Sequence, residues 1–212
     1  YLSGNVREKL AVARRLAESE PVFAANVTAL EEVQPTDLTA SEISVRLGAT
    51  WLPEDVVQEF MYQLLDTPYY AQWKVKVHYS SYTGGGNVEG KSYDRSNINA
   101  TSTYGTDRVN AYKIIEDTLN LRDVRVFDYV EDENGKRVPI LNKKETAIAQ
   151  GKQELIKQAF QDWIWKDQPR RERLCKLYNE QFNALRPREY DGTHLKFVGM
   201  NPEIQLRQHQ LN

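Results

Sequence analysis

Apolar side chains recur every three to four positions through most of the first third of the chain, which is the spacing of one face of an α-helix. Such runs occupy residues 6–17, 23–30 and 56–65. Thr39 and Glu42 have the spacing of a capping box and predict a further short helix that ends near Gly48. Residues 1–67 are therefore predicted to be a helical N-terminal part.

The pattern changes to alternation after Pro68. In the stretch WKVKVHYSSY, residues 73–82, apolar and polar side chains take turns, which is typical of a strand with one buried face. A glycine-rich turn at 83–87 follows, and weaker strand candidates lie at 88–94 and 97–105. This part of the chain is therefore predicted to be rich in strands.

Asn134 and Gly135 lie between two apolar runs, residues 124–129 and 138–140. An Asn-Gly pair in this setting is the strongest short-range signal of a β-hairpin. Residues 68–141 are therefore predicted to form a small, mostly antiparallel sheet that includes this hairpin.

The longest predicted helix opens at Asn142, which has capping-box spacing to Glu145. Its apolar stripe continues to Ile164, and a second amphipathic helix begins at about Pro169. The connection between the two helices is short, which predicts that they pack antiparallel. Residues 142–202 are therefore predicted to be a long helical hairpin with a following loop, and the whole chain to be an α+β protein.

The composition indicates a folded globular chain, since 40% of the 212 residues are hydrophobic and 27% are charged. Apolar runs are only a few residues long, so no segment is predicted to span a membrane. Cys175 is the single cysteine, which excludes an internal disulfide and favours a cytoplasmic location.

The net charge of −2 hides an asymmetry along the chain. Residues 1–72 hold five Lys and Arg against eleven Asp and Glu, whereas residues 143–188 hold eleven against six. A basic segment predicts contact with a polyanion such as DNA, although long helices also carry solvated charges of both signs. The candidate DNA-binding residues are Lys143, Lys144, Lys152, Lys157, Arg170, Arg171, Arg173 and Lys176.

No catalytic residue and no metal-binding set is predicted, because the three histidines lack the spacing of zinc ligands. Glu89 and Lys91 resemble the Glu-x-Lys of restriction-type nucleases, in which carboxylates hold a divalent metal. The upstream acid, Asp66, lies in a helix-like stretch, which does not suit that motif. A metal-dependent nuclease built on Glu89 and Lys91 is therefore kept only as one alternative.

Tyrosines of the strand-rich part are interleaved with Lys and Arg, a combination found where proteins bind single-stranded nucleic acid. These tyrosines are Tyr79, Tyr82, Tyr93 and Tyr104. Core packing is the preferred interpretation, since strand alternation already accounts for Tyr79.

Three stretches carry a resemblance to a known family. They are YLSGNVREKL at 1–10, ASEISVRLGATWLP at 40–53, and LNKKETAIAQGKQELIKQAFQDWIW at 141–165 together with RPREYDGTHLKFVGMNPEIQLRQHQ at 186–210. The chain resembles the middle section of very large bacterial proteins of conjugative elements and phages. Those proteins join an adenine-specific DNA methyltransferase to a Swi/Snf-like superfamily-two helicase.

The resemblance implies that the chain is a piece of a longer polypeptide, with the methyltransferase before Tyr1 and the motor after Gln210. Residues 203–212 would then begin the helicase motor, and Gln210 would read the adenine of ATP in the parent protein. ATP, magnesium and S-adenosylmethionine are implied for that parent. The chain itself contains no Gly-Lys-Thr loop, no Asp-Glu pair and no Asn-Pro-Pro-Tyr, so no cofactor is expected on it.

The sequence therefore predicts a non-catalytic connector that contributes to DNA binding and couples a methyltransferase to a helicase. The expected partners are DNA and the flanking domains of the same polypeptide, without a membrane. Two alternatives stay open, a purely structural or protein-interaction module and the metal-dependent nuclease described above.

Overall fold

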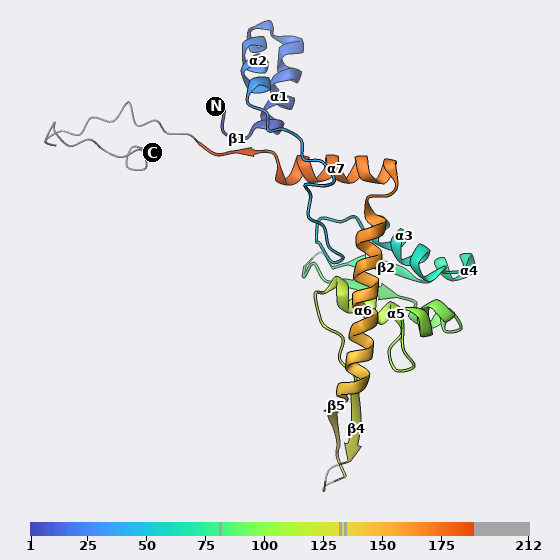
Figure 1. Cartoon of the computed structure of the whole chain (residues 1–212). Coiled ribbons are helices and arrows are strands. Elements are labelled where there is room, and N and C mark those ends of the chain that lie inside the picture. The colour runs from blue at the N-terminus through green and yellow to red at the C-terminus, as the bar shows by residue number, and fades with distance from the viewer. Residues whose placement is uncertain (81, 132, 134, 189–212) are drawn as a thin grey trace, which may run out of the picture. The chain divides into compact units, whose positions relative to one another are not determined.

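The computed structural model describes residues 1–80, 82–131, 133 and 135–188, and it has the predicted α+β fold (Figure 1). The predicted start of the motor at 203–212 lies outside these residues. Within the described ranges no helix is both long enough and apolar enough to cross a membrane.

The chain divides into two units, Tyr1–Thr39 with Lys176–Asn212, and Ala40–Cys175. These boundaries differ from those predicted after 67 and 141. Units are defined by which segments pack together, whereas periodicity in the sequence reports only where one type of element gives way to another.

The first unit is a small helical cluster closed by a short sheet. It contains β1 (Gly4–Asn5), α1 (Val6–Ser19), η1 (Pro21–Phe23), α2 (Ala24–Glu32), the end of α7 (Gln168–Phe182) and β6 (Leu185–Arg186). The Asn5 side chain caps α1 by accepting a hydrogen bond from the Glu8 N–H at 3.0 Å. Val6, Leu10 and Leu30 are buried between the helices, as their helical spacing predicts.

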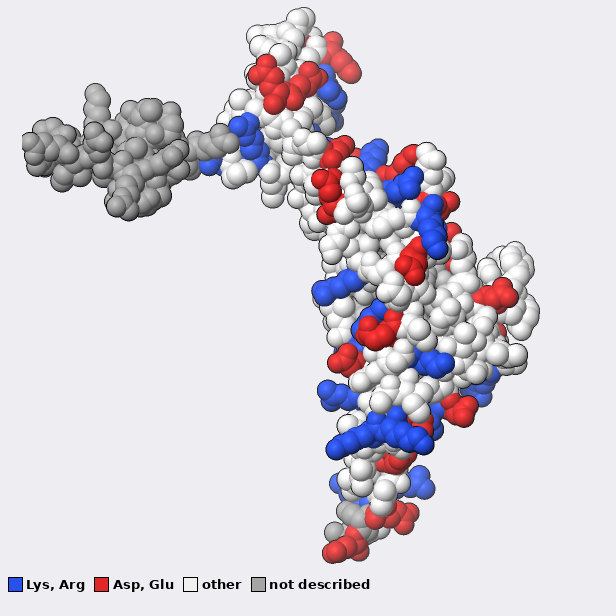
Figure 2. Space-filling view, viewed as in Figure 1, with Lys and Arg blue, Asp and Glu red and all other residues white. Residues whose placement is uncertain are grey.

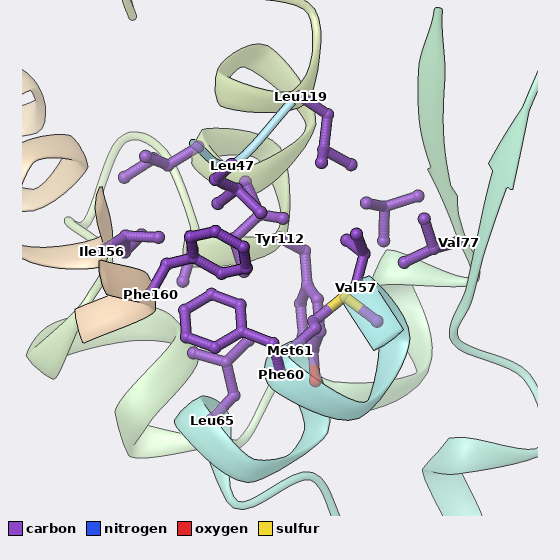
Figure 3. Packing of buried hydrophobic residues seen from close by; sticks show 14 of the residues in the cluster. Leu47, Val57, Phe60, Met61, Leu65, Val77, Tyr112, Leu119, Ile156 and Phe160 are labelled. Atoms are coloured by element: carbon purple, nitrogen blue, oxygen red, sulfur yellow. The ribbon is translucent and has the colours of Figure 1, made fainter. Parts of the chain in front are cut away.

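The second unit holds the larger core. Its elements are α3 (Glu54–Leu65), α4 (Tyr69–Gln72), β2 (Lys76–Tyr79), β3 (Gly86–Glu89), η2 (Lys91–Asp94), η3 (Asn99–Thr103), α5 (Ala111–Leu119), β4 (Phe127–Glu131), β5 (Arg137–Leu141), α6 (Lys143–Ile164) and the start of α7. Figure 3 shows the rings of Phe60 from α3 and Phe160 from α6 next to each other in this core. Their centroids lie 5.1 Å apart in an edge-to-face arrangement, and Tyr112 of α5 is buried beside them.

Two antiparallel hairpins form in this unit, β2 with β3 and β4 with β5. Val77 and Val88 of the first hairpin are buried, in agreement with the predicted alternation. The strand begins only at Lys76, however, and Trp73 is 67% exposed instead of lying on the buried side. The reason is that α4 follows Pro68 and carries the chain to Gln72 before it can extend.

The segment with the predicted capping box, at Thr39 and Glu42, forms turns and irregular backbone instead of a helix. Ile43, Val45 and Leu47 are buried at alternate positions, so the segment presents its apolar side chains with period two. The weaker strand candidate at 97–105 is likewise a short helix, η3. At Thr39 and Glu42 the local capping signal was overridden by the burial of these apolar side chains.

The long helix is confirmed as α6, and the Asn142 side chain caps it by accepting from the Glu145 N–H at 3.0 Å. The predicted antiparallel hairpin needs correction. The first turns of α7, which belong to the same unit as α6, leave its end at a steep angle instead of returning along it (Figure 1). They contact α3, where Arg173 binds Asp55, and Leu174 enters the core.

Candidate nucleic-acid interface

The predicted basic residues of α6 do not gather on one face of the helix. Lys152 and Lys157 are five residues apart, which places them about 140° apart around the axis. Lys152 donates to the carbonyl oxygen of Thr103 at 2.9 Å, while Lys157 pairs with Glu154 at 2.6 Å. Figure 2 shows Lys and Arg interleaved with Asp and Glu over the visible surface. A single broad basic face is therefore absent from the part of the chain in view.

Lys143 and Lys144 are exposed in the first turn of α6 and make no ion pair within the described ranges. Lys176 lies in the first unit and approaches Glu180 at 3.9 Å. All three ammonium groups are open to solvent, so each can meet a phosphate.

The arginines of α7 have different environments. Arg170 is buried, and its guanidinium lies over the Trp163 ring at 3.5 Å from the centroid. Arg173 is half-exposed and holds both carboxylate oxygens of Asp55 at 2.5 and 3.0 Å, which lowers the pKa of Asp55. Arg171 is exposed. Because Arg170 is buried, its role is structural. Of the three arginines, Arg171 is the one that is exposed and makes no ion pair among the described residues.

Three cationic side chains line a pocket of about 320 Å³ between α6, the end of α5 and the segment before α3. We call it the basic pocket. It is lined by Arg46, Leu47, Thr118, Leu121, Arg122, Asp123, Gln153, Lys157 and Gln161. Lys157 is the member of this set that was predicted from the sequence.

One wall of the basic pocket is held by Gln153, a buried polar side chain of α6. Its amide nitrogen donates to the Arg122 carbonyl at 2.7 Å and to the Thr118 hydroxyl at 3.1 Å. Its amide oxygen accepts from the Val124 N–H at 3.2 Å. These three bonds fix the backbone that carries Arg122 against the helix that carries Lys157.

The opposite wall is held by two close approaches. Gln161 of α6 donates to the Val45 carbonyl at 2.5 Å and so positions the residue before Arg46. Gly48 has φ +94°, and a Cβ there would lie 2.8 Å from the carbonyl oxygens of Thr118 and Leu119. Only glycine therefore lets this segment reach the end of α5, and the approach brings Arg46 to the rim of the pocket.

Leu121 forms the rim between these walls and has φ +55°, a left-handed conformation that is rare for a residue with a branched side chain. The turn is fixed by bonds from the Leu121 N–H to the Thr118 carbonyl at 3.0 Å and from the Arg122 N–H to the Asp117 carbonyl at 2.8 Å. Backbone strain of this kind is often found beside functional sites.

The charges of the basic pocket are only partly compensated. Arg46 and Arg122 make no ion pair among the described residues, and Lys157 pairs with Glu154, which is itself largely exposed. Asp123 is the acidic residue of the lining. Two guanidinium groups and an ammonium group around one pocket suit an oxyanion, above all a phosphate, because guanidinium groups bind oxyanions through paired N–H groups.

A second polar pocket, of about 590 Å³, lies beside the start of α5 and includes Arg95, Arg108 and Lys113. Two of its three cations are already neutralised. Arg108 pairs with Asp128 at 2.8 Å, and Lys113 binds both Glu116 and Asp117 at 2.9 Å. This pocket is therefore a weaker candidate for an anion.

Core packing, the preferred interpretation of the tyrosines in the strand-rich part, is wrong for Tyr82 and Tyr93, which are exposed. Tyr93 belongs to an exposed aromatic surface whose other members, Tyr69, Tyr70, Trp73 and Lys74, sequence reasoning missed. Its four rings are each between 59% and 72% exposed. Tyr69 and Trp73 are in edge-to-face contact at 5.9 Å, and the Lys74 ammonium lies 5.8 Å from the Tyr93 ring. The signal available in the sequence was Tyr-Tyr directly after Pro68, which starts a helix too short to bury its side chains.

The residues of the nuclease alternative turn toward different partners. Glu89 approaches His78 at 3.8 Å, while the Lys91 ammonium binds Glu116. No cluster of His, Cys, Asp and Glu suited to a metal ion occurs in the described ranges. Gln210, the residue matched to the adenine contact of the parent, lies outside them.

One family, described as Domain of unknown function (DUF8437), has a model that matches residues 46–184. The match covers more than half of the chain, so the chain belongs to this family. The matched segment begins at Arg46 and includes every residue that lines the basic pocket. Neither the curated proteins nor the solved structures gave a match.

Proposed function

We propose that this chain, a member of the DUF8437 family, is a non-catalytic DNA-binding connector that holds a backbone phosphate in the basic pocket. The observation that carries the proposal is the meeting of Arg46, Arg122 and Lys157 around one pocket whose two arginines make no ion pair among the described residues. The positive charges of these two arginines are therefore available to a ligand, because no ion pair among the described residues neutralises them.

The construction of the pocket supports this proposal. Arg46, Arg122 and Lys157 come from three segments that Gln153 and Gln161 hold together through hydrogen bonds. Little backbone ordering would therefore be left to occur on binding, and preorganisation of this kind raises affinity. Contacts to phosphate position a protein on DNA without reading the sequence, which suits a connector.

The resemblance described above extends the proposal to the longer polypeptide. There the chain would hold DNA between a methyltransferase and a helicase, in the cytoplasm of a bacterium. ATP, magnesium and S-adenosylmethionine would bind to those flanking domains. Coupling of the two activities would follow from DNA held at a fixed place between them.

Fluorescence anisotropy with a labelled DNA duplex at low salt tests the proposal. We expect the Arg46→Gln/Arg122→Gln variant to bind the duplex about thirtyfold more weakly, since each of the two charge-assisted contacts contributes roughly 1 kcal/mol or more. Both arginines are exposed, so the variant should fold normally.

The matched control is Arg14→Gln/Arg15→Gln, which removes the same charge from α1 in the other unit. It should bind the duplex nearly as well as the unaltered chain. An equal loss of affinity in both double variants would show that only net charge matters, and would refute a site at the basic pocket.

A second candidate function is the binding of single-stranded nucleic acid on the aromatic surface. Exposed rings offer faces on which bases can stack, and Lys74 lies among them. Trp73 should then lose fluorescence when an oligothymidine is added, and Trp73→Phe should remove this response. Unchanged Trp73 fluorescence at saturating oligothymidine would exclude this candidate.

A further inference from the structure

The β4–β5 hairpin exposes apolar side chains on both of its faces. It extends beyond the start of α6 (Figure 1), and nearly every one of its side chains is exposed. The apolar residues are Phe127, Tyr129, Val130, Val138, Ile140 and Leu141, each between 39% and 68% exposed. An isolated two-stranded hairpin is only marginally stable in water, so we expect these faces to be covered by a partner.

The phase of the ladder shows which backbone groups point away from the hairpin. The Asn142 N–H donates to the Val126 carbonyl at 2.9 Å, so this pair is hydrogen-bonded. Bonded and non-bonded pairs alternate in an antiparallel ladder. The pair of Tyr129 with Pro139, three positions further along, is therefore a non-bonded pair whose backbone groups face outward.

The two outer edges of the hairpin consequently differ. Pro139 has no N–H, so the β5 edge lacks a donor at its centre and resists the addition of another strand. The β4 edge presents both the N–H and the carbonyl of Tyr129. Next to it, the Phe127 carbonyl accepts one bond from the Arg108 guanidinium at 3.0 Å, which confirms that this group faces outward.

We propose that a second copy of this chain adds its own β4 to this edge, antiparallel and about a twofold axis between the two Tyr129 residues. The result is a four-stranded sheet with order β5-β4-β4-β5. Both outer edges of that sheet then carry Pro139, so it cannot grow further. A twofold axis also closes the assembly at two chains.

Charge complementarity favours a second copy as the occupant. In this register Phe127 of one copy lies opposite Glu131 of the other, because each is two residues from Tyr129. Arg108 is held at Phe127 by its bond to the carbonyl and already pairs with Asp128 of its own chain at 2.8 Å, while Glu131 makes no ion pair among the described residues. Each copy therefore brings an uncommitted carboxylate toward the guanidinium of the other, twice in the dimer. The two Tyr129 rings also meet, as cross-strand aromatic pairs do.

Sedimentation equilibrium of the unaltered chain, over a wide range of concentrations, tests the proposal first. We expect a reversible equilibrium between a 24.6 kDa monomer and a species of twice that mass. Arg108→Glu and Glu131→Arg should each weaken the dimer by about tenfold or more, since each places like charges opposite one another. Arg125→Glu, at the base of the hairpin, should leave the dimer intact.

An equimolar mixture of Arg108→Glu and Glu131→Arg provides the decisive comparison. In a mixed dimer both contacts again join opposite charges, so the mixture should dimerise although neither variant does so alone. A role of Arg108 only in folding would leave the mixture monomeric. A monomeric unaltered chain, or a dimer that persists in both single variants, would overturn the proposal and leave the hairpin to another protein or to a flanking domain.

Discussion

The guanidinium of Arg170 lies over the indole of Trp163 at 3.5 Å from the ring centroid. Its N–H groups also donate to the carbonyls of Trp163 at 2.8 Å and Ile164 at 3.0 Å, and it approaches Glu59 at 3.4 Å. Both carbonyls belong to the last turn of α6, where the helix leaves carbonyls without helical partners. The Trp163 carbonyl also accepts from the Lys166 N–H at 3.2 Å. Arg170 therefore caps α6 from the first turn of α7 and ties both helices to α3.

Replacing Arg170 by Ala should lower the free energy of unfolding by about 2–3 kcal/mol, because the Ile164 carbonyl loses the Arg170 donor and the stacking on Trp163 is lost. Urea denaturation followed by circular dichroism measures this change. The neighbouring Arg171→Ala serves as control and should shift stability by about 0.5 kcal/mol or less, as is usual for surface positions. Equal effects of the two substitutions would mean that Arg170 does not cap α6.

Two glycines should respond to alanine in opposite ways. Gly151 lies within α6, and a Cβ there meets nothing within 4 Å, so Gly151→Ala should stabilise the fold by about 1 kcal/mol. Gly90 has φ +67°, and its Cβ would lie 2.1 Å from the Lys74 carbonyl. Gly90→Ala should therefore destabilise the fold by about 2 kcal/mol or more. Thermal melts of both variants, side by side, check the signs, and the same sign for both would contradict this account.

Glu116 should make stability depend on pH in the acid range. Burial raises the pKa of Glu116, but hydrogen bonds from Lys91, Lys113 and the Val88 N–H outweigh it and lower the pKa from 4.5 to about 2. Because the folded-state pKa is the lower one, the stabilisation is complete above pH 4.5 and is lost as the pH falls toward 2.

The melting temperatures of the unaltered chain and of Glu116→Gln, measured from neutral pH down to about 2, test this linkage. The advantage of the unaltered chain over Glu116→Gln should shrink between pH 4.5 and 2. An advantage that stays constant across this window would show that the ion pairs of Glu116 do not stabilise the fold.

The sequence predicted those elements whose local signals agree with their burial. The Asn142 cap and the buried Ile156 and Phe160 of α6 are examples, because capping and apolar spacing point to the same helix. Prediction failed at Thr39 and Glu42, where a capping box has no apolar stripe of helical period behind it. The alternating burial of 43–47 was the stronger signal there.

The candidate site was less accessible to sequence reasoning. Lys157 was predicted, but Arg46 and Arg122 lie 111 and 35 positions before it, in segments that show no basic run. The packing of α5 and the Gly48 segment against α6 brings them together. Conversely, Arg170 was counted in the basic segment although it is buried. The net charge along a sequence does not show which cationic side chains are buried or paired in the folded protein.

The salt dependence of duplex binding tests the central claim, that Arg46 and Arg122 hold a DNA phosphate in the basic pocket, most directly. Each phosphate contact contributes about 0.9 to the slope of log K against log salt concentration. We predict that Arg46→Gln/Arg122→Gln reduces this slope by about 1 relative to the unaltered chain, because one phosphate contact is lost, while Arg14→Gln/Arg15→Gln leaves it nearly unchanged. No binding by the unaltered chain at low salt, or the same slope for all three proteins, would contradict the claim.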